Sequence, residues 1–189
     1  GNSKLGRIPN VSLLPIVSCP ENVPCTDRCY CQHSKFYKGP FECWKRNLDA
    51  CADNLVEYMA GIRDYLAKHQ PRFFRWHVAG DIPRGELGDA YYKEMVAIAK
   101  EFPATRFLCF TKRHDTKFGK LPKNLTIVLS MWNNFGNTRK KLPRAWYLDP
   151  KDPDPRIPDD AIECPGDCEH CGMCWALPKL GRDVVFEKH

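Results

Sequence analysis

The amino-acid sequence predicts a single α/β domain built around a mostly parallel sheet. Short apolar segments of strand character alternate along the chain with amphipathic helical segments, which is the pattern of βαβ units. The chain has 189 residues, of which 43% are hydrophobic and 12% aromatic, so one well-buried core is expected. Two cysteine-rich loops and one proline-rich connector separate these elements.

Helices and strands are expected where the apolar periodicity changes. Residues 44–69 and 85–102 have apolar side chains at helical spacing, and each predicts one helix. The first strand is expected at 11–18, an apolar run that leads into a cysteine loop despite Pro15. The segments expected to form the other strands are 72–81, 105–113, 124–132 and 183–189.

Residues 147–160, YLDPKDPDPRIPDD, form a proline-rich acidic stretch that cannot be a regular helix or a central strand. We expect an extended connector here. Residues 1–146 then form the α/β core with the first cysteine loop. Residues 147–189 form the connector and the second cysteine loop, packed on the same domain.

Charge is unevenly distributed along a chain whose net charge is +6. Residues 149–170 are acidic, so the remainder is strongly basic and could attract nucleic acid or form an ordinary solvated surface. No apolar run approaches the roughly 20 residues of a membrane span. The start lacks the basic and apolar segments of a signal peptide. We therefore expect a cytoplasmic protein that does not enter a membrane.

Cysteine is used eleven times, and eight of these residues form two groups. Secreted proteins pair such cysteines in disulfides, but cysteines in a cytosolic protein more often bind metal. Cys43, Cys51 and Cys109 stand apart and are expected to be small core residues. The two groups are Cys19, Cys25, Cys29 and Cys31, and Cys164, Cys168, Cys171 and Cys174.

The second group is a continuous run, C-x3-C-x2-C-x2-C over residues 164–174. Zinc ribbons and fingers usually present two separate Cys-x2-Cys pairs, whereas continuous runs wrap an iron-sulfur cubane. Gly166 and Gly172 fit either metal, because tight loops round a metal need backbone freedom. The spacing favours a [4Fe-4S] cluster and leaves zinc as the alternative.

The first group reads C-x5-C-x3-C-x-C over residues 19–31. Cys29 and Cys31 would point to opposite sides of an extended chain, so both three and four ligands remain open. Three thiolates would leave one iron free to bind a substrate or cofactor. Cys31 would then be a spare thiol.

Ligands of parallel α/β sheets bind at the carboxyl ends of the strands, and the first cysteine loop falls at this edge. Gly80 and Asp81 follow the second expected strand, and Lys112 and Arg113 end the third. We take Gly80, Asp81 and Lys112 as candidate cofactor-binding residues. The alternatives are a turn cap for Asp81 and a solvated surface for the cations. His77 is expected to be a packed core histidine.

This arrangement resembles the radical S-adenosylmethionine (SAM) superfamily, in which a C-x3-C-x2-C loop after the first strand holds a four-iron cluster and SAM chelates the open iron. CTDRCYC, residues 25–31, is similar to that loop, with the third cysteine one residue early. VAGDIP, residues 78–83, is similar to the Gly-Gly-Glu-Pro turn that meets the methionine amine, with Asp81 for Glu and Ile82 inserted. The resemblance implies an incomplete parallel (β/α) barrel and SAM as a cofactor.

Nearly the whole chain also resembles the gene-product-eighty-eight domain family, which bacteriophages encode. The segments that carry this resemblance are GNSKLGRIPNVSL, RFFRWHVAGDIP, RFLCFTKR and ECPGDCEHCGMCWAL. The resemblance implies a phage or prophage origin and expression in a bacterial host's cytoplasm. It implies no particular reaction or substrate.

Two classes of function follow as hypotheses. The first is a redox or radical SAM enzyme with one or two [4Fe-4S] clusters, the N-terminal group being SAM-type and the C-terminal group auxiliary. A single cluster with ligands from both groups is also open. The second is a non-enzymatic protein, with a fold stabilised by an iron-sulfur cluster or zinc, that binds nucleic acid or a host protein.

Overall fold

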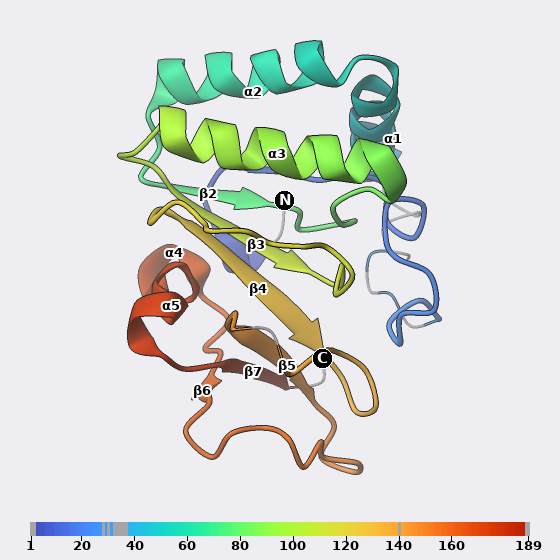
Figure 1. Ribbon diagram of the computed structural model, residues 1–189, viewed down its shortest axis with the longest axis vertical. Coiled ribbons are helices and arrows are strands. Elements are labelled where there is room, and N and C mark those ends of the chain that lie inside the picture. The colour runs from blue at the N-terminus through green and yellow to red at the C-terminus, as the bar shows by residue number, and fades with distance from the viewer. Residues whose placement is uncertain (1–2, 28, 30, 32–37, 140, 188–189) are drawn as a thin grey trace.

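A seven-stranded, all-parallel sheet forms the centre of the computed structural model, which describes residues 3–27, 29, 31, 38–139 and 141–187 (Figure 1). The strand order is β1-β2-β3-β4-β5-β7-β6. The strands are β1 (Asn10–Val11), β2 (Phe73–Trp76), β3 (Arg106–Thr111), β4 (Leu125–Met131), β5 (Arg144–Leu148), β6 (Ile162–Glu163) and β7 (Val184–Glu187). The helices are α1 (Lys38–Asp53), α2 (Leu55–His69), α3 (Gly85–Glu101), α4 (Cys168–Cys171) and α5 (Leu177–Leu180), with 3-10 turns η1 (Ser3–Leu5) and η3 (Met173–Ala176).

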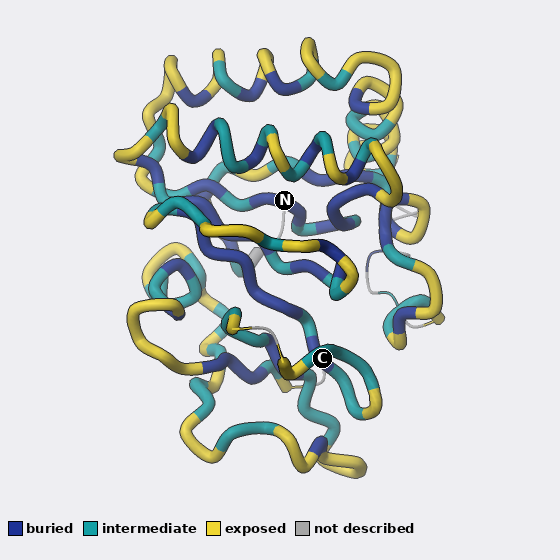
Figure 2. Tube along the Cα trace, viewed as in Figure 1, coloured by how far each residue is buried: buried dark blue, intermediate teal, exposed yellow. Residues whose placement is uncertain are grey.

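Different parts of the chain cover the two faces of the sheet. Helices α1, α2 and α3 pack on one face, and the segment from α4 to α5 packs on the other (Figure 1). Strand β3 shows the alternation: Phe107 and Cys109 join the helix-side core, and Leu108 joins the core on the opposite side. Because both faces are covered, the central strands are buried along almost their whole length (Figure 2).

The prediction of an α/β domain with a mostly parallel sheet is confirmed. Helix α3 and strands β2, β3, β4 and β7 lie within the segments expected for them, although residues 188 and 189 of the last segment lie outside the described residues. Across the described part of the chain, no helix is both long enough and apolar enough to traverse a bilayer.

The first strand is much shorter than expected, so the prediction for residues 11–18 is wrong beyond Val11. Pro15 has no backbone N–H to donate to a ladder, and Ile16 has a φ of 70°. The Ser12 hydroxyl instead accepts bonds from the backbone N–H groups of Val78 and Ala79, at 3.1 and 3.2 Å. The chain therefore leaves the sheet after Val11 and packs over the turn that follows β2.

The single helix predicted for residues 44–69 is two helices, and the first begins earlier, at Lys38. Asn54 separates them, because its side chain accepts a hydrogen bond from the backbone N–H of Glu57 at 3.2 Å and so caps α2. The break lets α1 and α2 lie at an angle to each other (Figure 1).

Strands β5 and β6 were not anticipated. Strand β5 reaches Leu148 and so crosses the expected boundary between residues 146 and 147. The expected connector contains no helix or strand from residue 149 to residue 160. After it, β7 pairs with both β5 and β6, so the C-terminal part of the chain extends the same sheet.

Candidate metal centres

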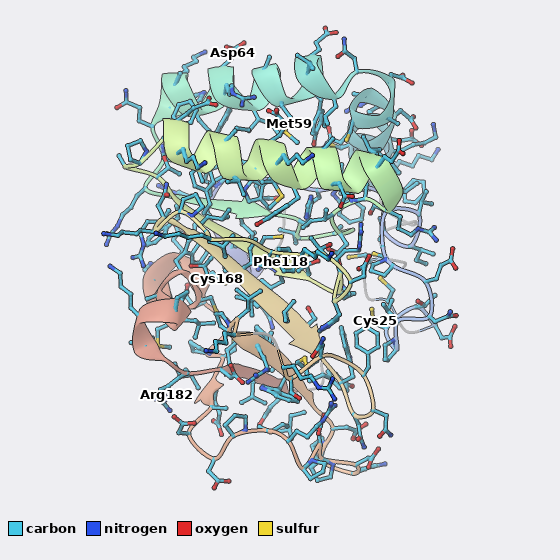
Figure 3. All side chains as sticks on the ribbon, viewed as in Figure 1. Cys25, Met59, Asp64, Phe118, Cys168 and Arg182 are labelled. Atoms are coloured by element: carbon cyan, nitrogen blue, oxygen red, sulfur yellow. The ribbon has the colours of Figure 1, made fainter. Side chains whose placement is uncertain are left out.

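All eleven cysteines lie in the described part of the chain, and all are free thiols. Figure 3 shows Cys25 and Cys168 on opposite sides of the molecule. The N-terminal group lies beyond the carboxyl ends of the strands, and the C-terminal group lies against the sheet face opposite α1–α3. The structure therefore presents two separate thiol sites and does not bring the two groups together into one ligand set.

The four C-terminal cysteines line one pocket between β6, α4 and η3. Asp167 caps α4 by accepting a hydrogen bond from the backbone N–H of His170, at 3.3 Å. Gly172 ends α4 with a φ of 59°, and a Cβ there would lie 3.3 Å from the Phe73 ring. This glycine allows the chain to turn tightly against β2 between Cys171 and Cys174.

Trp175 anchors this pocket to the sheet and was not anticipated from the sequence. Its indole Nε1 donates to the carbonyl of Phe74 at 3.3 Å, and its ring centroid lies 4.9 Å from that of Phe73. Its own carbonyl accepts bonds from the Arg106 guanidinium at 2.9 Å and the Thr126 hydroxyl at 3.2 Å. The neighbouring Cys174 is thereby held against the strands.

The C-terminal thiols influence one another electrostatically. Burial raises the pKa of Cys174 to about 12, with Cys164, Cys168 and Cys171 adding to the increase. Burial also raises the pKa of Cys168. Such thiols keep their protons at neutral pH unless a cation stabilises the thiolate, as a bound metal does.

Arg75 supplies a positive charge beside these thiols and opposes the rise in pKa at Cys168 and Cys174. Its guanidinium carbon lies 4.7 Å from the centroid of the Phe110 ring. Its Nε is buried and has no hydrogen-bond partner among the described residues. Within that part of the chain, no carboxylate forms an ion pair with Arg75.

The N-terminal loop is fastened to the turn after β2. The Ser18 hydroxyl donates to the carbonyl of Leu14 at 2.8 Å and accepts a bond from the backbone N–H of Asp81 at 3.1 Å. Gly80 has a φ of 78°, and a Cβ there would lie 2.5 Å from the carbonyl oxygen of Leu13. Gly80 therefore lets the loop approach the turn closely.

Asp81 joins the turn after β2 to the end of β3. Its carboxylate is fully buried and accepts bonds from the Thr111 hydroxyl at 2.5 Å and the backbone N–H groups of Ile82 and Lys112 at 2.8 and 2.7 Å. The Lys112 ammonium lies 3.5 Å from the same carboxylate. The structure thus brings Gly80, Asp81 and Lys112 together at the carboxyl edge, with Asp81 already engaged by its own chain.

The N-terminal thiols lie close to this ion pair. Burial raises the pKa of Cys19 to about 11, while the Lys112 charge lowers it and Asp81 and Cys25 raise it. Burial also raises the pKa of Cys25, while the Lys112 charge lowers it and Cys29 raises it. Cys31 is buried. Cys19 and Cys25 therefore influence each other electrostatically, as do Cys25 and Cys29, and Lys112 at the end of β3 acts on both Cys19 and Cys25.

The isolated cysteines and His77 occupy different environments. Cys51 and Cys109 are fully buried, as expected of core residues. The same prediction is wrong for Cys43, which is exposed because it lies off the face of α1 that contains Cys51. His77 is packed in the core, 3.0 Å from the Tyr91 hydroxyl. Among the described residues, no three His, Cys, Asp or Glu side chains converge closely enough to hold one metal ion.

The fold and these sites define a parallel α/β protein with two separate groups of cysteines, each beside a cationic side chain. The chain matches the family model described as Gene product 88 over residues 2–177, and it belongs to that family. No curated protein and no solved structure matches the chain. The radical-SAM-like core stays a prediction that these comparisons do not support.

Proposed function

We propose that the chain is an iron-sulfur redox protein with two separate [4Fe-4S] sites. The observation that carries the proposal is the pocket lined by Cys164, Cys168, Cys171 and Cys174, which Trp175 and the sheet border on one side. Cysteine thiolates are the usual ligands of such clusters. A cluster bound there would supply one-electron chemistry, and the chain would hold it and shield it from water.

The arrangement of the C-terminal thiols favours a cluster over a single zinc ion. A zinc ion needs four ligands at about 2.3 Å from one point. A cubane takes its ligands at separate irons, so its thiolates are spread more widely round a loop. The four cysteines here form one continuous run and line one pocket, which fits ligands carried on a loop round a cubane better than two separate pairs.

The N-terminal group is the proposed reactive site, because it lies at the carboxyl edge, where ligands of parallel sheets bind. Cys19, Cys25 and Cys29 are the three proposed ligands, which leaves the fourth iron position for a substrate or cofactor. Radical SAM chemistry, in an incomplete barrel of that superfamily, is the second candidate. It is favoured by a cysteine loop that directly follows β1, but the amine of SAM would have to compete with Lys112 for Asp81.

Iron and sulfide analysis of anaerobically prepared protein tests the two-site proposal. We expect about eight irons and a similar amount of acid-labile sulfide in the native chain. Cys168→Ser should remove about half of each, because one cluster loses a ligand. Cys43→Ser is the matched control and should remove none, since Cys43 is exposed on α1.

The same preparations separate the alternatives. A colourless protein that contains zinc and no sulfide would refute the proposal in favour of a zinc-stapled module. Formation of 5'-deoxyadenosine from SAM by the reduced protein would establish the radical SAM candidate. Clusters that accept no electron from dithionite would instead support a structural role in a protein that binds nucleic acid or a host protein. Nucleic-acid binding of that kind should weaken as salt rises.

A further inference from the structure

We propose that Arg75 is the counter-ion of the C-terminal cluster and raises its reduction potential. This inference rests on the proposed function, because it requires a cluster bound by Cys164, Cys168, Cys171 and Cys174. Arg75 would act through its charge on the cluster and is a positioning residue, not a ligand.

The strand geometry directs Arg75 to the cysteine side of the sheet. Side chains two residues apart on a strand share a face, so Arg75 lies on the same face as Phe73. Phe73 is the ring that packs against Trp175 and borders Gly172. The Arg75 guanidinium lies over Phe110, which belongs to the same hydrophobic cluster as Cys164, Cys168 and Cys174.

In the described part of the chain no carboxylate forms an ion pair with Arg75, whose guanidinium instead lies over the Phe110 ring. A partly buried cation without a counter-charge is unfavourable, and a nearby anion relieves that cost. Four thiolates on a cubane carry more negative charge than the iron core neutralises. The cluster therefore supplies the negative charge that Arg75 lacks.

Reduction of the cluster adds one electron and breaks no bond. With dithionite as the reductant, the electron is donated by dithionite, which is oxidised, and the cluster becomes more negative by one charge. A fixed positive charge nearby stabilises the reduced form more than the oxidised form. At the N-terminal site the corresponding cation, Lys112, is already paired with Asp81. Arg75 therefore favours placing the electron on the C-terminal cluster.

The test is a redox titration of the C-terminal cluster, monitored by electron paramagnetic resonance. Cys25→Ser and Cys29→Ser are combined in the full-length chain, so that the signal comes from the C-terminal site alone. Arg75→Gln should disfavour reduction about tenfold, which is about 59 mV for a one-electron couple. Arg75→Lys keeps the positive charge, so its reduction potential should stay close to that of the chain with Arg75. Arg72→Gln is the control for an exposed charge, because Arg72 immediately precedes β2 and is exposed.

Each outcome decides the inference. A background chain without iron overturns the proposed function, and the inference falls with it. If the background chain holds iron but Arg75→Gln lowers the reduction potential no more than Arg72→Gln does, the inference is overturned and the proposed function stands. If Arg75→Gln loses its iron, retention by Arg75→Lys supports the role of the charge. Loss in both variants overturns it, because the charge would then be insufficient.

Discussion

Replacing Gly80 by alanine should detach the N-terminal cysteine loop from the sheet. The added Cβ would lie 2.5 Å from the carbonyl oxygen of Leu13 and 2.5 Å from the Ser18 hydroxyl oxygen. The hydroxyl can rotate, but the carbonyl is part of the backbone that packs over the turn after β2. The loop must therefore move away from the turn that contains Asp81.

The cost has two parts. Alanine at a φ of 78° costs about 1–2 kcal/mol relative to glycine. Moving the loop also weakens two hydrogen bonds of 3.1 Å, from the Leu13 N–H to the Ala79 carbonyl and from the Asp81 N–H to the Ser18 hydroxyl. Each contributes about 0.5–1.5 kcal/mol. The free energy of unfolding should thus fall by about 2–5 kcal/mol.

Gly85→Ala is the matched control. Gly85 also has a positive φ, 64°, but a Cβ there would meet nothing within 4 Å. Its cost should be limited to the backbone term of about 1–2 kcal/mol. Urea unfolding followed by tryptophan fluorescence gives both values, and iron analysis shows whether Gly80→Ala also loses the N-terminal cluster. Equal destabilisation by the two variants, with full iron in both, would refute the close-approach argument.

Two further predictions concern buried polar groups. Burial lowers the pKa of His77 from its usual 6.5 to about 4, so the unfolded chain binds the extra proton between these values. The contribution of neutral His77 to the free energy of unfolding should therefore be fully present above pH 6.5 and fall by about 3 kcal/mol as the pH approaches 4. Urea unfolding midpoints of His77→Gln, measured across this range, should lack that part of the pH dependence. Asp183→Ala should cost about 3 kcal/mol, because the backbone N–H of Arg144 and the Trp146 indole, each 2.8 Å from its carboxylate, lose a buried acceptor. Asp160→Ala, at an exposed ion pair, should cost under about 1 kcal/mol in the same urea assay.

The sequence was sufficient where local periodicity and strand ends determine position. The apolar spacing of residues 85–102 predicted α3, and the rule that ligands gather at carboxyl strand ends predicted that Asp81 and Lys112 lie at the same edge of the sheet. Each of these inferences needs only the chain near the residue and the parallel character of the sheet. The break at Asn54 was missed, although asparagine before an apolar helical segment is a common N-cap.

Contacts between distant segments could not be read in this way. In the sequence, Arg75 is one residue of a segment with strand character, and Trp175 is the residue that follows a cysteine run. Neither pattern indicates which residue the other contacts. Their roles depend on the packing of residues 164–177 against β2, β3 and β4, which local patterns do not encode. Strand β5 was missed for a related reason, because its five residues lie between Pro143 and the acidic connector and are fixed by pairing with β4 and β7.

Strand β2 and the turn after it position both thiol sites. Phe73 packs against Trp175 of the C-terminal pocket and Arg75 lies on the same face of β2, while Gly80 and Asp81 hold the N-terminal loop. Arg75 and Gly80 are five residues apart, so their Cα atoms are separated by at most about 18 Å. Because β2 and the turn that follows it connect the two positions, a change in β2 should disturb both sites, whereas a change in α4 should disturb only one. Under the proposed two-cluster function, this shared support would hold the two clusters at a separation set by the sheet.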